Sequence, residues 1–335
     1  MKTLVCEKPG EWTWRQEEIP ELSEGEVLVR IKRVGICGTD LHAFQGNQAF
    51  FSYPRVLGHE LSGVIEDPNG SDLTPGQPVL IIPYIHCGTC LACRRGATNC
   101  CADMKVIGVH EDGGMREFLS ISKDLVVPAE GIDLDAMALV ECLAIGAHSV
   151  RRGQITEADT VVIVGAGPIG LGAVQFAKAN DARVIVVDMN QSRLEFCERE
   201  FGAETVIAGP DAVEKVGELT NGEFASVVID ATGHAGAMMN SVNFCGHSAN
   251  LVFVGLTKGD ITYTHTELHK RELTIYCSRN ATKEDFTRVI ELMQSGKVQS
   301  SCMVTHRSSL ENMPGEFAEW LKPETGVVKA IVEVG

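Results

Sequence analysis

A glycine-rich turn between a strand-like run and a helix-like run restricts the fold of this chain more than any other feature. Residues 161–170 read VVIVGAGPIG, and the stretch LGAVQFAKAN and a second β-branched run, RVIVVD, follow. Strand, tight turn and helix in this order predict a Rossmann βαβ unit, in which the helix N-terminus faces the phosphates of a dinucleotide. The predicted coenzyme-binding residues of the turn are Gly165, Gly167, Pro168, Ile169 and Gly170.

An acidic residue, Asp188, ends the second run. At this place a carboxylate accepts hydrogen bonds from the ribose hydroxyls of adenosine and repels a 2′-phosphate. Met189, which follows, supplies no positive charge. We therefore expect NAD rather than NADP as the coenzyme.

Four cysteines fall in the segment CGTCLACRRGATNCC, at Cys87, Cys90, Cys93 and Cys101. This spacing predicts a structural zinc ion held by four thiolates, with Cys100 as the spare thiol. An iron–sulfur cluster is the alternative, because close Cys-x-x-Cys repeats also bind such clusters.

A second possible metal site is built from different residue types. Cys37 lies in GICGTDLH, His59 and Glu60 lie in GHE, and Glu141 lies in VECLAIGAH. One thiolate, one imidazole and one or two carboxylates form a mixed set that leaves a position open for substrate. We expect this set to hold a catalytic zinc, so that each chain binds one catalytic and one structural ion.

The length and composition agree with a two-domain protein. The chain has 335 residues and a formal net charge of −16, which argues against nucleic-acid and membrane partners. Twelve cysteines and an N-terminus that does not resemble a secretory signal favour a reducing compartment, so we expect a cytoplasmic protein.

The distribution of strand-like and helix-like segments predicts an α/β fold with a discontinuous first domain. Residues 1–146 contain short β-branched runs such as GEVLVRIKRV, and in residues 147–279 runs such as ASVVID, NLVFVG and ELTIYC alternate with amphipathic segments. We therefore expect an irregular β domain formed by 1–146 and 280–335, and a doubly wound parallel sheet in 147–279.

Together these motifs resemble the zinc-dependent medium-chain alcohol dehydrogenase family. The resemblance is carried by GICGTDLH, GHE, the cysteine segment, VECLAIGAH, GAGPIG and the terminal GVVKAIVEV, and it extends over the whole chain. It is greatest to bacterial polyol and sugar-acid dehydrogenases, of the L-galactonate 5-dehydrogenase-like and sorbitol dehydrogenase-like types, which carry glutamate at the place of Glu141. The resemblance implies a GroES-like catalytic domain beside the Rossmann domain, and a homo-oligomer, dimer or tetramer.

The resemblance also implies roles for individual residues. Thr39 and His42 match the family's proton relay, in which a hydroxyl and an imidazole carry the alcohol proton out of the pocket. Several positions match the family's coenzyme contacts, at the adenine, the nicotinamide and the pyrophosphate: Arg193, Thr232, Gly255 and Lys329. Ordinary surface or turn positions are the alternative for each of these four.

The sequence does not decide between the two glutamates. We expect Cys37, His59 and Glu141 as zinc ligands, with Glu60 exchanging with water, but the reverse assignment also occurs among resembling enzymes. The chain departs from the family's Glu-Pro pair, because Cys142 follows Glu141. This loosens the backbone restraint on the ligand.

Arg279, in YCSRNAT, is the predicted substrate residue, since polyol dehydrogenases similarly keep an arginine there. A guanidinium suits a carboxylate better than a hydroxyl, which favours a sugar acid over a neutral polyol. The expected reaction is NAD-dependent interconversion of a secondary alcohol and a ketone. The alternatives are an L-threonine 3-dehydrogenase and a non-catalytic protein that binds zinc and NAD.

Overall fold

The computed structural model describes residues 1–48 and 51–335, which divide into two compact units. The first contains Met1–Glu141 and Gln299–Gly335, and the second contains Cys142–Val298. The second unit is therefore longer at both ends than the predicted domain of 147–279. Helix α10 (Lys283–Gln294) belongs to the second unit rather than to the catalytic domain, because its Asp285 accepts hydrogen bonds from Arg151 of the same unit.

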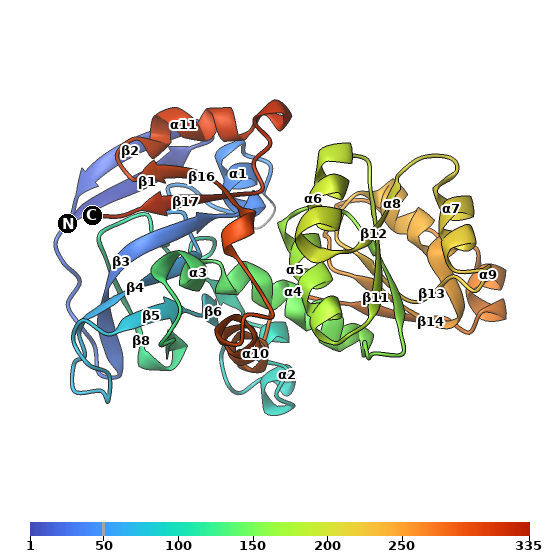
Figure 1. The fold of residues 1–335 in the computed structure, drawn as a ribbon. Helices are drawn as coiled ribbons and strands as arrows, with labels where there is room; N and C mark the ends of the chain where they lie inside the picture. The colour runs from blue at the N-terminus through green and yellow to red at the C-terminus, as the bar shows by residue number, and fades with distance from the viewer. Residues whose placement is uncertain (49–50) are drawn as a thin grey trace. The chain divides into compact units, whose positions relative to one another are not determined.

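The main sheet of the first unit has the strand order β16-β17-β3-β4-β5-β9, and β8 also pairs with β3 (Figure 1). Neighbouring strands are antiparallel except β16 and β17. Two hairpins, β1-β2 and β6-β7, complete the strands of this unit. The strands are β1 (Lys2–Lys8), β2 (Glu11–Gln16), β3 (Glu26–Ile36), β4 (Glu60–Asp67), β5 (Pro78–Ile81), β6 (Tyr84–Ile85), β7 (Lys105–Val106), β8 (Phe118–Ser122), β9 (Val126–Pro128), β16 (Val304–Ser309) and β17 (Lys329–Glu333).

Alternate residues of β3, near the centre of this sheet, point into the core. Val27, Val29 and Ile31 occupy alternate positions and are fully buried, as expected when one strand face packs on a core. The helices of this unit are short: α1 (Gly38–Phe44), α2 (Leu91–Arg94), α3 (Leu134–Ala138) and α11 (Met313–Trp320). Rings from α1, β2 and α11 meet in the core, with centroids 5.1 Å apart for Trp12 and Phe44 and for Phe44 and Phe317.

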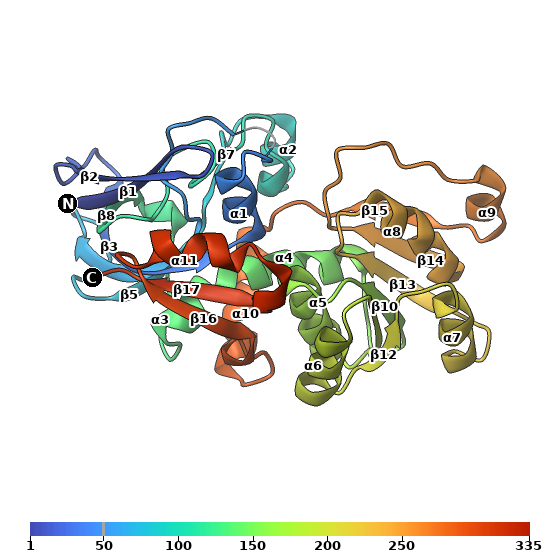
Figure 2. The same ribbon diagram turned by 90° about the horizontal axis from the view of Figure 1, so that it is seen from above.

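The second unit is built on a parallel sheet with the strand order β12-β11-β10-β13-β14-β15, with helices on both faces (Figure 2). This order is that of a doubly wound dinucleotide-binding fold. Its strands are β10 (Thr160–Val164), β11 (Arg183–Asp188), β12 (Glu204–Ile207), β13 (Ala225–Asp230), β14 (Cys245–Phe253) and β15 (Thr274–Cys277). Besides α10, the helices are α4 (Val140–Gly153), which begins at the end of the first unit, α5 (Pro168–Ala179), α6 (Gln191–Phe201), α7 (Ala212–Leu219), α8 (Ala235–Asn240) and α9 (His265–Lys270).

The structure contains the strands expected in this unit and adds β12, which the sequence analysis does not anticipate. One of the two edge strands of this sheet is β15. Its neighbour β14 is an inner strand, because it pairs with both β13 and β15. Within the described ranges, none of the helices has the length and apolar character needed to cross a membrane.

Candidate active site and metal sites

The four predicted structural ligands lie together in the first unit. The Sγ atoms of Cys87, Cys90, Cys93 and Cys101 are all within 4.8 Å of one another. Cys90 is the N-cap of α2, so Cys93 falls in the first turn of that helix. The adjacent Cys100 is exposed and lies outside this group. Four thiols at this separation suit a tetrahedral ion with no open position.

The backbone around these thiols favours thiolates. N–H groups of Thr89 and Cys90 lower the pKa of Cys87 to about 6, since they donate hydrogen bonds to its sulfur. Burial instead raises the pKa of Cys93 to about 12, so this thiolate needs a nearby cation. A bound zinc ion would supply that charge, and the group fits a structural zinc.

The second metal-binding group consists of Cys37, His59 and Glu60, whose ligand atoms also lie within 4.8 Å of one another. Cys37 is the N-cap of α1, and Glu60 begins β4, directly after His59. In the sheet, Glu60 pairs with Gly35 of β3. A Cβ atom at Gly35 would lie 2.3 Å from Oε2 of Glu60, so this position leaves the space that the glutamate occupies.

Asp40, for which no role was expected, holds together the two segments that carry Cys37 and His59. Its carboxylate accepts hydrogen bonds from the N–H groups of Cys37 (2.9 Å) and Gly58 (3.1 Å), and Nδ1 of His59 lies 3.6 Å from Oδ1. Burial opposes ionisation, but His59 and the two N–H groups lower the pKa of Asp40. An acid three residues after the N-cap is the signal of a capping box that could have revealed it.

The two glutamates share one bonding pattern. Oε1 of Glu60 accepts a hydrogen bond from Nζ of Lys329, and Oε1 of Glu141 accepts one from the hydroxyl of Tyr84. The Oε2 atoms of both glutamates are buried and have no hydrogen-bond partner among the described residues. The structure brings Glu60, but not Glu141, into the 4.8 Å group with Cys37. Distance alone therefore favours Glu60 over the expected Glu141.

Lys329, which we expect at the pyrophosphate, is buried beside Glu60. Its side chain is 1% exposed, and Nζ donates to Glu60 and to the carbonyl oxygen of Ile36. A buried ammonium needs a nearby carboxylate, and Glu60 provides it. In this structure Lys329 is therefore a partner of the metal-binding group.

The surroundings of His59 favour a cation. Although burial disfavours a charged imidazole, Asp40 and Cys37 raise the pKa of His59 well above its ordinary value. The same anions would attract a metal ion. Orphaned Oε2 atoms are costly in a protein interior, and coordination would satisfy them. The residues present therefore fit a zinc ion.

The two predicted relay residues lie on α1, next to Cys37. Thr39 is half-buried and His42 is exposed. Residues three apart on a helix lie on the same face, so the hydroxyl and the imidazole are neighbours on this short helix.

The predicted coenzyme residues gather at the carboxyl edge of the parallel sheet. Gly165, after β10, has φ +99, and a Cβ at Gly170 would lie 1.8 Å from its carbonyl oxygen. The turn and the close approach of α5 therefore both require glycine. Gly167 is the N-cap of α5, and Pro168 and Ile169 form its first turn.

Asp188 and its neighbours lie on the same edge. Asp188 is the last residue of β11, and its carboxylate accepts hydrogen bonds from the N–H groups of Ala166 (2.6 Å) and Asn190 (2.8 Å). These bonds fix an acid beside the glycine turn. A Cβ at Gly167 would lie 3.8 Å from Nη1 of Arg193, so this arginine, on α6, also borders the turn.

Thr232 and Gly255 follow β13 and β14 at this edge. The Thr232 hydroxyl donates to Asp230 (2.7 Å), and the N–H of Gly255 donates to the Asp230 carbonyl oxygen (3.2 Å). Arg279 lies two residues after β15 and is exposed. Beside it, Ser278 Oγ and Asn280 Nδ2 are buried atoms without a hydrogen-bond partner among the described residues.

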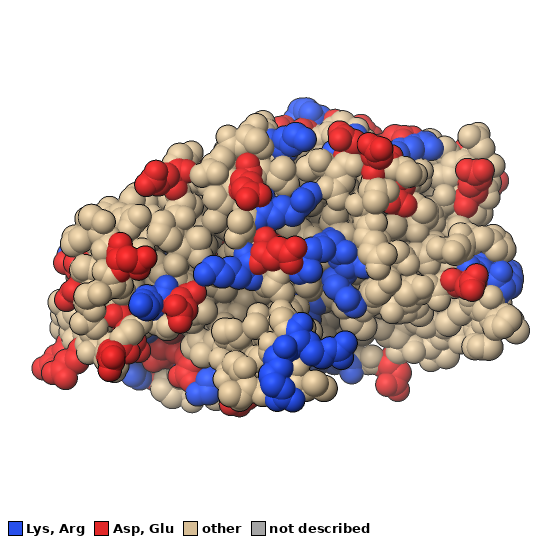
Figure 3. Space-filling view, turned by 90° about the horizontal axis from the view of Figure 1, so that it is seen from below, with Lys and Arg blue, Asp and Glu red and all other residues tan. Residues whose placement is uncertain are grey.

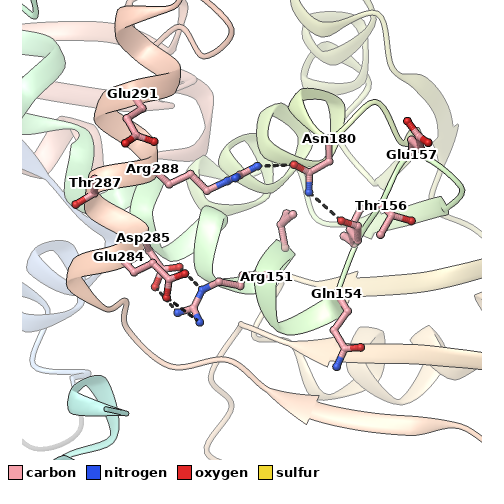
Figure 4. A pocket seen from close by; sticks show the side chains of 12 residues that line it. Arg151, Gln154, Thr156, Glu157, Asn180, Glu284, Asp285, Thr287, Arg288 and Glu291 are labelled. Atoms are coloured by element: carbon pink, nitrogen blue, oxygen red, sulfur yellow. Dashed lines mark hydrogen bonds and ion pairs between the residues drawn. The ribbon is translucent and has the colours of Figure 1, made fainter.

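A pocket of about 860 Å³ lies elsewhere in the second unit, between the end of α4, the segment before β10 and α10 (Figure 4). Some of its polar groups are paired with one another. Arg151 bonds Asp285 (2.7 Å), and Arg288 bonds Asn180. On the face drawn in Figure 3, basic and acidic side chains lie next to one another at several places, so the negative net charge does not dominate it.

Two family models match the chain. Alcohol dehydrogenase GroES-like domain matches residues 23–131, and Zinc-binding dehydrogenase matches residues 168–295.

Similar proteins agree with these matches over nearly the full length. L-galactonate-5-dehydrogenase of Escherichia coli K12 is 49% identical, with 99% of this chain and 98% of that protein covered. L-threonine 3-dehydrogenase of Bacillus licheniformis is 31% identical, with 99% of both covered. The crystal structure of RspB from E. coli CFT073, described as complexed with NADH, is 30% identical, with a TM-score of 0.93 and 99% of both chains covered. The chain therefore belongs to the zinc-binding, GroES-like alcohol dehydrogenases.

Proposed function

We propose that this protein is a zinc- and NAD-dependent oxidoreductase that interconverts a secondary alcohol and a ketone on a sugar acid of the L-galactonate type. The observation that carries the proposal is the group of the half-buried Cys37 and the buried His59 and Glu60, whose mixed ligands leave an open position for substrate. The 49% identity to L-galactonate-5-dehydrogenase supports the substrate class.

Bound zinc would act as a Lewis acid that makes the substrate hydroxyl more acidic. Cys37, His59 and one or both glutamates would hold the ion, and Asp40 keeps the first two in place. Thr39 and His42 would carry the substrate proton towards solvent.

The coenzyme would bind along the carboxyl edge of the parallel sheet. The glycine turn and the N-terminus of α5 would receive the pyrophosphate, and Asp188 would accept the ribose hydroxyls. Arg193 would border the adenosine, and Thr232 and Gly255 would lie towards the nicotinamide.

Arg279 would bind the acid group of the substrate. Its side chain is exposed, and the adjacent unpaired Ser278 and Asn280 atoms offer further polar contacts. Bidentate binding of a carboxylate is a property of arginine that lysine does not reproduce.

The test is a screen for NADH formation over aldonates, neutral hexitols and L-threonine, with zinc content measured on the same sample. Aldonate turnover with about two zinc ions per chain is expected. L-Threonine as the sole active substrate would identify a threonine dehydrogenase. About one ion without turnover would indicate a binding protein.

The variant Arg279→Lys tests the substrate residue. It should raise KM strongly for the aldonate and weakly for a hexitol, while the control Arg199→Lys, on the exposed face of α6, should leave both unchanged. An equal loss on both substrates would remove the preference for an acid.

Assembly and location are further parts of the proposal. The free edge β15, where Ile275 is 40% exposed, is suited to pairing in a dimer or tetramer. A cytoplasmic location is supported by the twelve cysteines, since no disulfide bond joins any two of them in the described ranges.

A further inference from the structure

The hydroxyl of Tyr84 has an unusual partner for a buried tyrosine. It donates to Oε1 of Glu141, and the residues are 6% and 3% exposed. Tyr84 comes from the two-residue strand β6, and Glu141 from the first turn of α4, 57 positions later in the chain. A buried phenol and a buried carboxylate both need a hydrogen-bond partner, and each satisfies the other.

This bond leaves only one oxygen of Glu141 available. Oε2 is buried and has no partner among the described residues, and the charges of His59 and Glu60 are close enough to act on the carboxylate. Oε2 of Glu141 therefore lies on a side chain beside the metal-binding group, and the bond from the Tyr84 hydroxyl fixes the plane of the Glu141 carboxylate.

The donor to Glu141 differs in charge from the donor to Glu60. Lys329 is a buried cation that forms an ion pair with Glu60, whereas the phenol that donates to Glu141 is neutral. At low local dielectric, an uncompensated carboxylate attracts a divalent cation more strongly than one already paired with an ammonium. Glu141 therefore has a neutral donor on Oε1 and an unpartnered Oε2, although Glu60 is the one grouped with Cys37 and His59.

We propose that Tyr84 is a positioning residue of the catalytic metal centre, which fixes Glu141 through Oε1 so that Oε2 can bind the ion. The inference rests on the zinc centre of the proposed function. Outer partners of this kind orient a ligand and tune its affinity for the metal.

The experiment measures the affinity of each zinc ion by competition with a chelator, in the wild type and in Tyr84→Phe. Loss of the phenol hydroxyl should weaken one of the two ions about 10- to 100-fold and leave the other unchanged. The absorption spectrum of the cobalt-substituted protein should change at the same ion. The control Tyr263→Phe removes a hydroxyl that donates to the Met238 carbonyl oxygen (2.8 Å), and it should alter neither ion.

A second pair of variants separates positioning from a general structural role. If Tyr84 acts through Glu141, Tyr84→Phe should have little further effect on zinc affinity in a Glu141→Gln background. An equal loss in both backgrounds, or unchanged affinity and cobalt spectrum in Tyr84→Phe, would overturn the inference. If Tyr84→Phe does not fold, Tyr84→Gln gives a second test, because the shorter polar side chain cannot hold Oε1 at the same place and leaves Glu141 itself unchanged.

Failure of the proposed function gives a different result. A wild type that binds two zinc ions and oxidises no aldonate, hexitol or threonine would refute the activity, while the affinity measurements would still decide the role of Tyr84. An active wild type with an unaffected Tyr84→Phe variant would refute only the role of Tyr84.

Discussion

Lys329 and Glu60 form a buried ion pair in which Nζ donates to Oε1, with side-chain exposures of 1% and 0%. Lys329 begins β17, and Glu60 begins β4 on the other side of β3, so the pair links segments 269 positions apart. Lys329 and Glu60 thus compensate each other's charge within the first unit.

Removing the lysine should destabilise the protein strongly. Lys329→Met leaves the Glu60 charge buried and unpaired, which costs about 3–5 kcal/mol in comparable cases. The double variant Lys329→Met with Glu60→Gln should recover part of this loss in urea unfolding. Lys322→Met, at an exposed pair with Glu319, is the control and should change stability by less than about 0.5 kcal/mol. Equal effects of the two lysine variants would contradict the structure.

The cysteine assignment predicts a contrast between adjacent residues. Cys101→Ser should lose one zinc ion per chain and lower the melting temperature, because Cys101 belongs to the four-thiol group. Cys100→Ser should keep the full zinc content, because Cys100 is exposed and outside that group. Metal analysis after dialysis measures both. Matching losses at the two positions would show that the ligand set is wrong.

Coenzyme preference should depend on Asp188. Asp188→Ala removes the acceptor for ribose hydroxyls and the charge that repels a 2′-phosphate, so the dissociation constant for NAD should rise and that for NADP should change little. Fluorescence titration with both reduced coenzymes gives the ratio. The exposed Asp211, on the loop before α7, serves as the control through Asp211→Ala. A wild type that prefers NADP would refute the role of Asp188.

Stability in acid should depend on Asp285. Burial disfavours its charge, but hydrogen bonds from His148, Arg151 and the N–H of Thr282 hold its pKa far below the ordinary value. A carboxyl group with a lowered pKa in the folded state stabilises the protein at pH values above its pKa in the unfolded chain, which is about 3.9. This stabilisation is lost as the pH falls towards the pKa of the folded state.

The difference in the free energy of unfolding between the wild type and Asp285→Asn should therefore be constant near neutral pH. Below about pH 4 it should shrink by up to about 1.4 kcal/mol per pH unit. Urea unfolding at several pH values measures it. The control is Asp211→Asn, at an exposed pair with Lys215. A difference that stays constant down to about pH 3 would contradict the assigned pKa direction.

Local motifs in the sequence predict much of this molecule. The glycine turn, the strand before it and the acid after the next strand lie within residues 161–188, and a short segment of this kind has few alternative folds. The four thiols lie within 15 residues, so their grouping in space follows from their spacing. The strands of the second unit other than β12 were also predictable, because each is an apolar run bounded by polar or glycine-containing segments.

Contacts between distant segments were not predictable from these patterns. The pairing of Tyr84 with Glu141 and that of Lys329 with Glu60 depend on strand order, which a single sequence does not specify. The same reason explains why α10 was assigned to the wrong unit: its amphipathic pattern predicts a helix, but the bond between Asp285 and Arg151 determines what it packs on. The free edge at β15 likewise follows from pairing alone.

The space left by Gly35 couples two positions in the evolution of this protein. Any larger residue at 35 would place its Cβ 2.3 Å from Oε2 of Glu60, and moving that carboxylate aside would disturb the bond from Lys329 to its other oxygen. Substitution at 35 should be tolerated only after residue 60 has become smaller, so the fitness effect of one change depends on the other. The order in which such changes can accumulate is thereby restricted, and a lineage that keeps the glutamate also keeps the glycine.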